Sequence, residues 1–116
     1  MELAFDSSSG NRTTTTASSL TWAHTCSGSS VYLFVGVFTD SGQTVTGVTY
    51  NGNAMTQLVS GRGYSAAPSE NTYWYGIAIG TGDGVAHNIV VSATGANDIA
   101  GVGFSLTFLS FYYDWY

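Results

Sequence analysis

The sequence predicts an all-β domain: a single antiparallel β-sandwich of about eight strands, jelly-roll-like, with an immunoglobulin-like sandwich as the alternative. Short apolar or alternating segments follow one another at intervals of about 8–12 residues, separated by Gly, Ser, Asn and Asp, as in a sandwich or barrel. The composition agrees, because 44% hydrophobic, 15% aromatic and only 8% charged residues suit pleated surfaces that pack together. At 116 residues the chain is expected to form one domain, 1–116.

The N-terminal segments predict edge and half-buried strands. Leu3 to Phe5 predicts an edge strand, and the Ser-rich segment 6–10 predicts a turn. The threonines of 12–17 favour extended structure, since branching at Cβ restricts χ1. In the segment 20–26 larger side chains alternate with smaller ones, which predicts a strand with one buried face: Leu20, Trp22, His24 and Cys26.

The middle of the chain carries the clearest strand signals. Segment 31–38 is apolar on both faces, which is typical of a strand in the middle of a sheet or in a subunit contact. Segments 44–50 and 53–59 flank Asn51-Gly52, a pair that accepts positive φ at both central positions of a type I′ turn. They predict a β-hairpin, and Gly47 predicts a bulge in it.

The remaining segments predict a long irregular stretch and three further strands. Residues 61–71 are irregular, and a strand follows at 72–79 with Tyr73 and Tyr75 inward and Trp74 on the opposite side. Residues 80–84 predict a loop, and 87–93 and 100–108 predict strands. The last strand is expected to face the core with its apolar side chains: Ala100, Val102, Phe104, Leu106 and Phe108.

Charge argues against several function classes. The chain has seven acidic and two basic side chains, a net charge of −5 and no lysine, so nucleic acid is not an expected partner. No run of apolar residues is long enough for a membrane helix, and no membrane partner is expected. The first residues lack a basic, then apolar, leader pattern, so we expect the protein to be made and folded in a cytosol.

No motif indicates catalysis or a cofactor. No Gly-x-Ser-x-Gly elbow or local carboxylate pair is present, so the chain is not expected to be an enzyme. His24 and Cys26 share a strand face, but a metal site needs further ligands and His87 is the only other imidazole. No calcium-loop spacing joins the loop carboxylates Asp6, Asp40, Asp83 and Asp98. We expect no metal and no cofactor.

Three segments carry a resemblance to a known module. They are Leu20-Thr-Trp-Ala-His-Thr25, the apolar strand 31–37 and the hairpin Val48-Thr-Tyr-Asn-Gly-Asn-Ala-Met-Thr56. Together they resemble a β-sandwich module of bacteriophage virion proteins and bacterial surface proteins, with the match covering roughly 20–108. The resemblance implies an assembly or adhesion component and brings no catalytic residues. The sequence departs from the pattern after Phe108, where an aromatic segment replaces a polar turn.

That aromatic segment, 109–116, is expected to contact another subunit. Tyr and Trp are enriched in interface cores because they bring large contact areas at low conformational cost. The expected contact residues are Phe111, Tyr112, Tyr113, Trp115 and Tyr116. A homo-oligomer is expected, with a trimer as the guess, because a closed ring would bury such patches symmetrically.

These observations lead to a functional expectation with two alternatives. The first is a non-enzymatic structural protein of a bacteriophage virion, a capsid decoration (cement) protein or a fibre or tail component, assembled in a host cytoplasm beside other virion subunits. The second is an extracellular or cell-surface adhesin or carbohydrate-binding module, with Trp74 and Tyr64 as possible glycan contacts. The third is a subunit of an extracellular filament.

Overall fold

The computed structural model describes residues 2–13, 15–40, 42–62 and 71–109 and forms nine β-strands in them. The strands are β1 (Glu2–Arg12), β2 (Ala17–Thr25), β3 (Val31–Thr39), β4 (Val45–Tyr50), β5 (Asn53–Ala54), β6 (Thr56–Arg62), β7 (Asn71–Gly80), β8 (Ala86–Asn97) and β9 (Ile99–Leu109). The prediction of an all-β fold is confirmed, with one strand more than expected.

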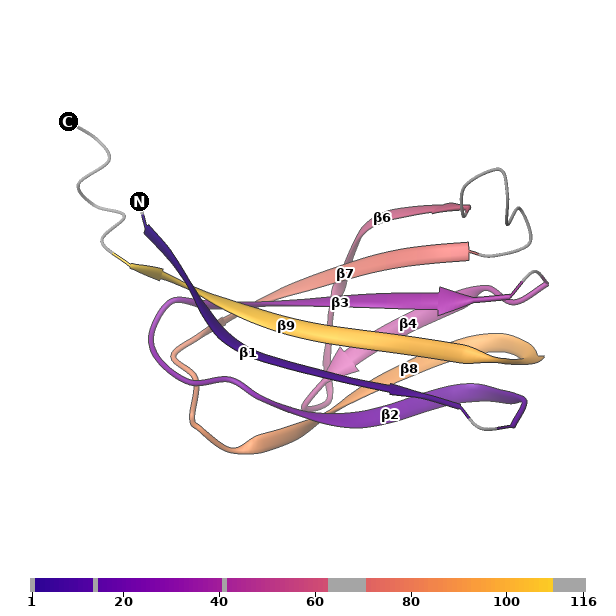
Figure 1. Cartoon of the computed structure of the whole chain (residues 1–116), viewed down its shortest axis with the longest axis horizontal. Coiled ribbons are helices and arrows are strands. Elements are labelled where there is room, and N and C mark those ends of the chain that lie inside the picture. The colour runs from indigo at the N-terminus through magenta and orange to yellow at the C-terminus, as the bar shows by residue number, and fades with distance from the viewer. Residues whose placement is uncertain (1, 14, 41, 63–70, 110–116) are drawn as a thin grey trace.

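The strands form two antiparallel sheets packed as a sandwich (Figure 1). One sheet has five strands in the order β1-β9-β3-β7-β6, and the other has four in the order β2-β8-β4-β5. The pairing is nested: β1 pairs with β9, β2 with β8, β3 with β7, and β4 with β5. A long hairpin rolled up on itself pairs in this way, which confirms the jelly-roll-like sandwich.

The core lies between the sheets and is built from alternating inward side chains. Leu33, Val35 and Val37 of β3 have no exposed surface, and neither have Ile89 and Val91 of β8. Because side chains alternate along a strand, the neighbours of these β3 residues point away from the core. The inward face of β2, with Leu20, Trp22 and His24, is buried as the sequence predicts.

The expected hairpin is present, but its second strand divides between the sheets. Asn51 and Gly52 have φ of 51° and 77°, the two positive values of a type I′ turn. The register of β4 shifts beside Gly47, which confirms the predicted bulge. β5 ends at Ala54, Met55 is buried, and β6 then pairs with β7 in the five-stranded sheet. Met55 therefore joins the core at the point where the chain crosses between layers.

Two expectations about the outer strands are wrong. The Ser-rich segment 6–10 is not a turn: β1 runs through it as the edge strand of the five-stranded sheet, with a register shift between Phe5 and Ser7. The serines extend because hydroxyls of Ser7 and Ser9 bond to the buried imidazole of His24, which replaces the bonds they would make in a turn.

The expected orientation of β9 is also reversed. Gly101, Gly103 and Ser105 lie opposite buried residues of β3 and face the core, so the large side chains at even-numbered positions face outward. The reason is space, because a Cβ at Gly101 would overlap the indole of Trp22 from the other sheet. Large side chains on β2 therefore require small ones on the inner face of β9.

Candidate functional site: the outer face of the five-stranded sheet

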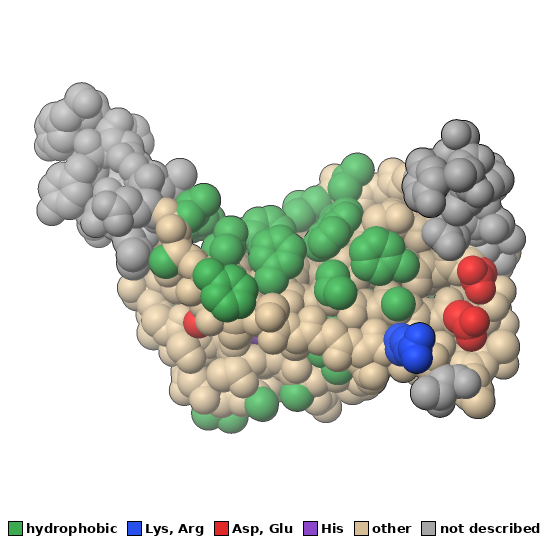
Figure 2. Space-filling model, in the orientation of Figure 1, with side chains coloured by type: hydrophobic (Ala, Val, Ile, Leu, Met, Phe, Trp, Pro, Cys, Tyr) green, Lys and Arg blue, Asp and Glu red, His purple; other side chains and the backbone are tan. Residues whose placement is uncertain are grey.

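The outward side chains of the five-stranded sheet form an apolar surface, which we call the outer face. It comprises Leu3 and Phe5 of β1, Val102, Phe104, Leu106 and Phe108 of β9, Tyr32, Phe34 and Phe38 of β3, Trp74 of β7, and Leu58 and Val59 of β6. Figure 2 shows hydrophobic side chains gathered over this sheet in one broad patch, with charged side chains off it. A sandwich normally presents polar side chains on such a face.

Several of these large apolar side chains expose about half of their surface or more. Phe5 is 66% exposed, Leu3 and Val59 are each 57% exposed, and Leu58 is 48% exposed. Scattered exposed hydrophobes are normal, but contiguous patches mark contact sites. Because these residues come from both edge strands of one sheet, the exposed surface extends across its whole width.

Five aromatic rings form a continuous chain across the middle of the outer face. Phe34 lies 4.8 Å from Tyr32 and 5.1 Å from Phe104 between ring centroids, the second pair being stacked. Trp74 meets Phe104 and Phe38 edge to face at 6.1 and 6.3 Å. These are the separations at which aromatic pairs attract. The rings therefore hold one another in place before any partner binds.

Two glycines let the largest rings lie down on the sheet. A Cβ at Gly36 would come within 2.6 Å of the Trp74 indole, and one at Gly76 within 2.7 Å of the Tyr32 ring. Both glycines are buried although they face outward, because these rings cover them. At these two positions, rings therefore fill the space that the missing side chains would otherwise leave open over the backbone.

The outer face is almost free of charge. Among the outward side chains that the structure describes on these strands, the charged one is Arg12, which lies at the far end of β1. Arg12 lines a pocket of about 360 Å³ together with Asp40 and Asp98, at the end of the sheet. The charged groups therefore gather at the rim, as in protein interfaces.

His24 is a structural residue rather than an available ligand or base. Its imidazole is 2% exposed, and its Nδ1 lies 2.7 Å from Ser9 Oγ while its Nε2 lies 2.9 Å from Ser105 Oγ. Ser105 donates to Asp6 and Trp22 Nε1 donates to Ser9 Oγ, so the pattern is satisfied when the ring is neutral and protonated on Nε2. Burial, opposed by the nearby Asp6 charge, lowers the pKa of His24.

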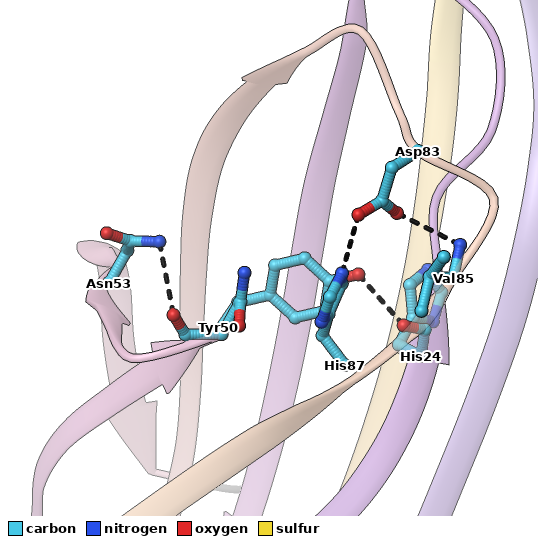
Figure 3. Close-up of polar contacts among 7 residues, drawn as sticks. His24, Tyr50, Asn53, Asp83, Val85 and His87 are labelled. Carbon is cyan, nitrogen blue, oxygen red and sulfur yellow. Dashed lines mark hydrogen bonds and ion pairs between the residues drawn. The ribbon is translucent and has the colours of Figure 1, made fainter.

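A polar cleft lies at the other end of the sandwich, around His87 (Figure 3). Asp83 accepts from the Val85 amide at 2.9 Å, and its other oxygen lies 2.7 Å from His87 Nε2; this pairing lowers the pKa of Asp83. Tyr50 donates to the His24 carbonyl at 2.8 Å, and burial raises its pKa. The cleft has a volume of about 430 Å³ and combines apolar walls with hydrogen-bonding groups.

The structure does not bring the potential metal ligands together. Over the described ranges, no three His, Cys, Asp or Glu side chains form a group that could hold a metal. Cys26 is buried, and burial raises the pKa of its thiol. In the same part of the chain no helix is long and apolar enough to cross a membrane.

Of the contact residues predicted from the sequence, the structure describes only Trp74. Phe111, Tyr112, Tyr113, Trp115 and Tyr116 lie outside the described residues, and so does Tyr64. Trp74 points away from the core as predicted, but it is half-buried among the rings of the outer face. The sequence indicated one part of the outer face, because segment 31–38, apolar on both faces, is typical of a strand in mid-sheet or in a subunit contact. The extent of the face over β1, β6, β7 and β9 was not predicted, although the small residues on one side of 100–108 signal it.

Comparison of the chain with protein-family models, curated proteins and solved structures finds no match. The two-sheet sandwich that the phage-module resemblance implies is present, and the family itself stays a prediction.

Proposed function

We propose that this protein is a non-enzymatic structural protein of a bacteriophage virion, either a capsid decoration protein or a fibre or tail component. The single observation that carries the proposal is the outer face, an apolar surface that spans five strands. Covering apolar surface stabilises an assembly by about 25 cal/mol per Å² removed from water. The role of the protein is mechanical, because each copy adds contact area between neighbouring subunits. Many such contacts together give a high overall avidity.

The buried polar groups support a structural role. Both ring nitrogens of His24 bond to serine hydroxyls inside the sandwich, so neither is free to move a proton for a substrate. A general base must reach its substrate within hydrogen-bonding distance. His24 is instead used to join strands of the two sheets.

The virion setting rests on three supports. Jelly-roll sandwiches recur in viral capsid domains, as well as in lectins. The sequence resemblance points to phage virion proteins. The net charge of −5 favours docking to a basic partner surface at the charged rim, with the apolar face supplying contact area.

Particles purified from cells that carry the gene test the proposal. We expect peptide mass spectrometry of gradient-purified particles to find this chain at a fixed ratio to the other particle proteins. The variant Val102→Glu, which puts a charge on the outer face, should remain in the soluble fraction. Ala23→Glu, at an exposed outward position of the opposite sheet, should still enter particles. Absence of the unmodified chain from particles would contradict the proposal.

Glycan binding is the second candidate, and the polar cleft is the observation that favours it. Sugars need apolar surface for the ring and hydrogen-bonding groups for the hydroxyls. The cleft offers Ile77 and Ile79 for the first and Asn53 and His87 for the second. If this candidate is correct, a glycan array will show saturable binding that His87→Ala removes. Loss on Trp74→Ala alone would instead place the glycan on the outer face.

A further inference from the structure

The outer face is an isolated apolar patch whose partner must match its shape and lack of charge. We propose that a second copy of this chain packs its own outer face against it, about a two-fold axis that lies parallel to the sheets in the plane between them. This inference rests on the proposed structural role and names the partner of that surface. The arrangement places the central rings of the two copies against each other.

The size of the face suits a stable dimer. Five strands spaced about 4.8 Å apart, each about nine residues long at roughly 3.4 Å per residue, cover roughly 700 Å². Two such faces would bury roughly 1,400 Å² in total, which lies within the standard range for specific interfaces. A short peptide would leave much of the patch in water.

The distribution of charge also favours an identical outer face as the partner. Each copy carries a net charge of −5, so copies repel one another unless their contact avoids the acidic groups. The outer face fulfils this condition, because its described outward side chains include no carboxylate. A basic partner would gain nothing from a face without acidic groups, whereas an identical apolar face gains from full burial.

The two ring-covered glycines favour a flat sheet over an inserted peptide segment as the partner of this face. Trp74 covers Gly36 and Tyr32 covers Gly76, so no groove is left over the backbone at these two positions for a side chain to enter. Two outer faces can stack as sheets do in a sandwich, at about 10 Å. A single self-complementary patch closes at two copies, so this arrangement gives a dimer, whereas the sequence suggested a trimer.

Sedimentation equilibrium of the full chain over a range of concentrations tests the inference. We expect a species of twice the 12.2 kDa chain mass that dissociates on dilution. Val102→Glu should give a monomer with an unchanged circular dichroism spectrum, because this side chain is 40% exposed in the free chain. Ala23→Glu, on the opposite sheet, should dimerise as the unmodified chain does.

The other outcomes separate the possible contacts. A monomer at every concentration would overturn the second-copy inference, while the particle experiment would still decide the proposed function. A dimer that survives Val102→Glu but is lost when the chain is cut after Leu109 would also overturn it and would assign the contact to 110–116.

Distances between spin labels give a direct geometric check. Nitroxide labels at Val102→Cys should lie closer together across the dimer than labels at Ala23→Cys, because outer faces meet while the four-stranded sheets lie outside. The native Cys26 is 1% exposed and should not react. The reverse order of distances would overturn the face-to-face arrangement.

Discussion

At the scale of single residues, this sandwich depends on glycines that face large rings. Gly101 lies under Trp22 inside the core, and Gly36 lies under Trp74 on the outer face. Neither glycine has a positive φ, so their role is space rather than backbone freedom. The protein interior is packed too tightly for a methyl group to be added there without moving a ring.

Two glycine substitutions test this explanation. Gly101→Ala should lower the free energy of unfolding by about 1–3 kcal/mol, because its Cβ would overlap the buried Trp22 indole. Gly47→Ala is the matched control: nothing lies within 4 Å of its added Cβ, and we expect no loss or a gain of about 0.4–1 kcal/mol. Urea unfolding followed by fluorescence measures both. Equal effects would show that the ring contact is unimportant.

His24 should make stability depend on pH in a defined window. Burial lowers its pKa in the folded state below the ordinary value of about 6.5, so the unfolded chain binds the proton more readily. Its contribution is therefore complete above about pH 6.5 and is lost as pH falls below that value, by up to about 1.4 kcal/mol per pH unit. The pKa of Asp83 is lowered as well, but a carboxylate takes up its proton only in more acidic solution. Asp83 therefore does not contribute to the change in stability between pH 7.5 and 5.5.

Urea unfolding at pH 7.5 and 5.5 measures this dependence. We expect a lower free energy of unfolding at pH 5.5, and in NMR spectra of the folded protein the pKa of His24 should lie below its ordinary value. Equal stability at the two pH values, or a His24 pKa in the folded protein at or above its ordinary value, would show that burial does not disfavour the charged imidazole.

At the scale of elements, the edge strand β1 is tied to β2 of the other sheet by polar side chains. Ser9 accepts from Trp22 Nε1 at 2.9 Å and bonds to His24 Nδ1 at 2.7 Å. Asp6 accepts from the Ser27 amide at 3.1 Å. β1 and β2 belong to different sheets and share no backbone pairing, so these side-chain hydrogen bonds hold the two sheet edges together on this side of the sandwich.

Neighbouring serines of β1 provide a matched test of this connection. Ser9→Ala would leave a buried indole donor and an imidazole nitrogen without their partner, and it should cost about 1–3 kcal/mol. Ser8→Ala, at an exposed outward position, should change stability by less than about 0.5 kcal/mol. Thermal unfolding distinguishes the two. Similar melting temperatures for both variants would argue against the polar connection.

How much of each element could be predicted depends on whether its signal is local. The Asn51-Gly52 turn and the buried face of β2 follow from adjacent residues, and both are confirmed. The orientation of β9 depends on Trp22, which lies about 80 residues away in the sequence, and local hydrophobicity pointed the wrong way. The apolar second face of β3 was recognised locally as a possible subunit contact, but the part of the outer face that β9 forms was not predicted, because it depends on the orientation of β9.

At the scale of the whole molecule, nested pairing brings the first and last strands together, and among the described residues nothing covers the outer face of the five-stranded sheet. The pairing of Glu2 with Leu109 joins residues from the two ends of the sequence, and pairings over such long separations are typical of slowly folding β-proteins. During that time the outer face and unpaired edges are exposed together. Assembly with another protein surface would remove the outer face from water.

Access of a soluble paramagnetic probe to labelled methyl groups tests most directly whether protein covers the outer face. In purified particles or in the concentrated protein, methyls of Val102, Leu58 and Val59 should be as protected as those of the buried Leu33. Val85, which is 53% exposed and lies off the five-stranded sheet, should stay accessible and serves as the internal control. Relaxation of the outer-face methyls equal to that of Val85 in both preparations would contradict the account.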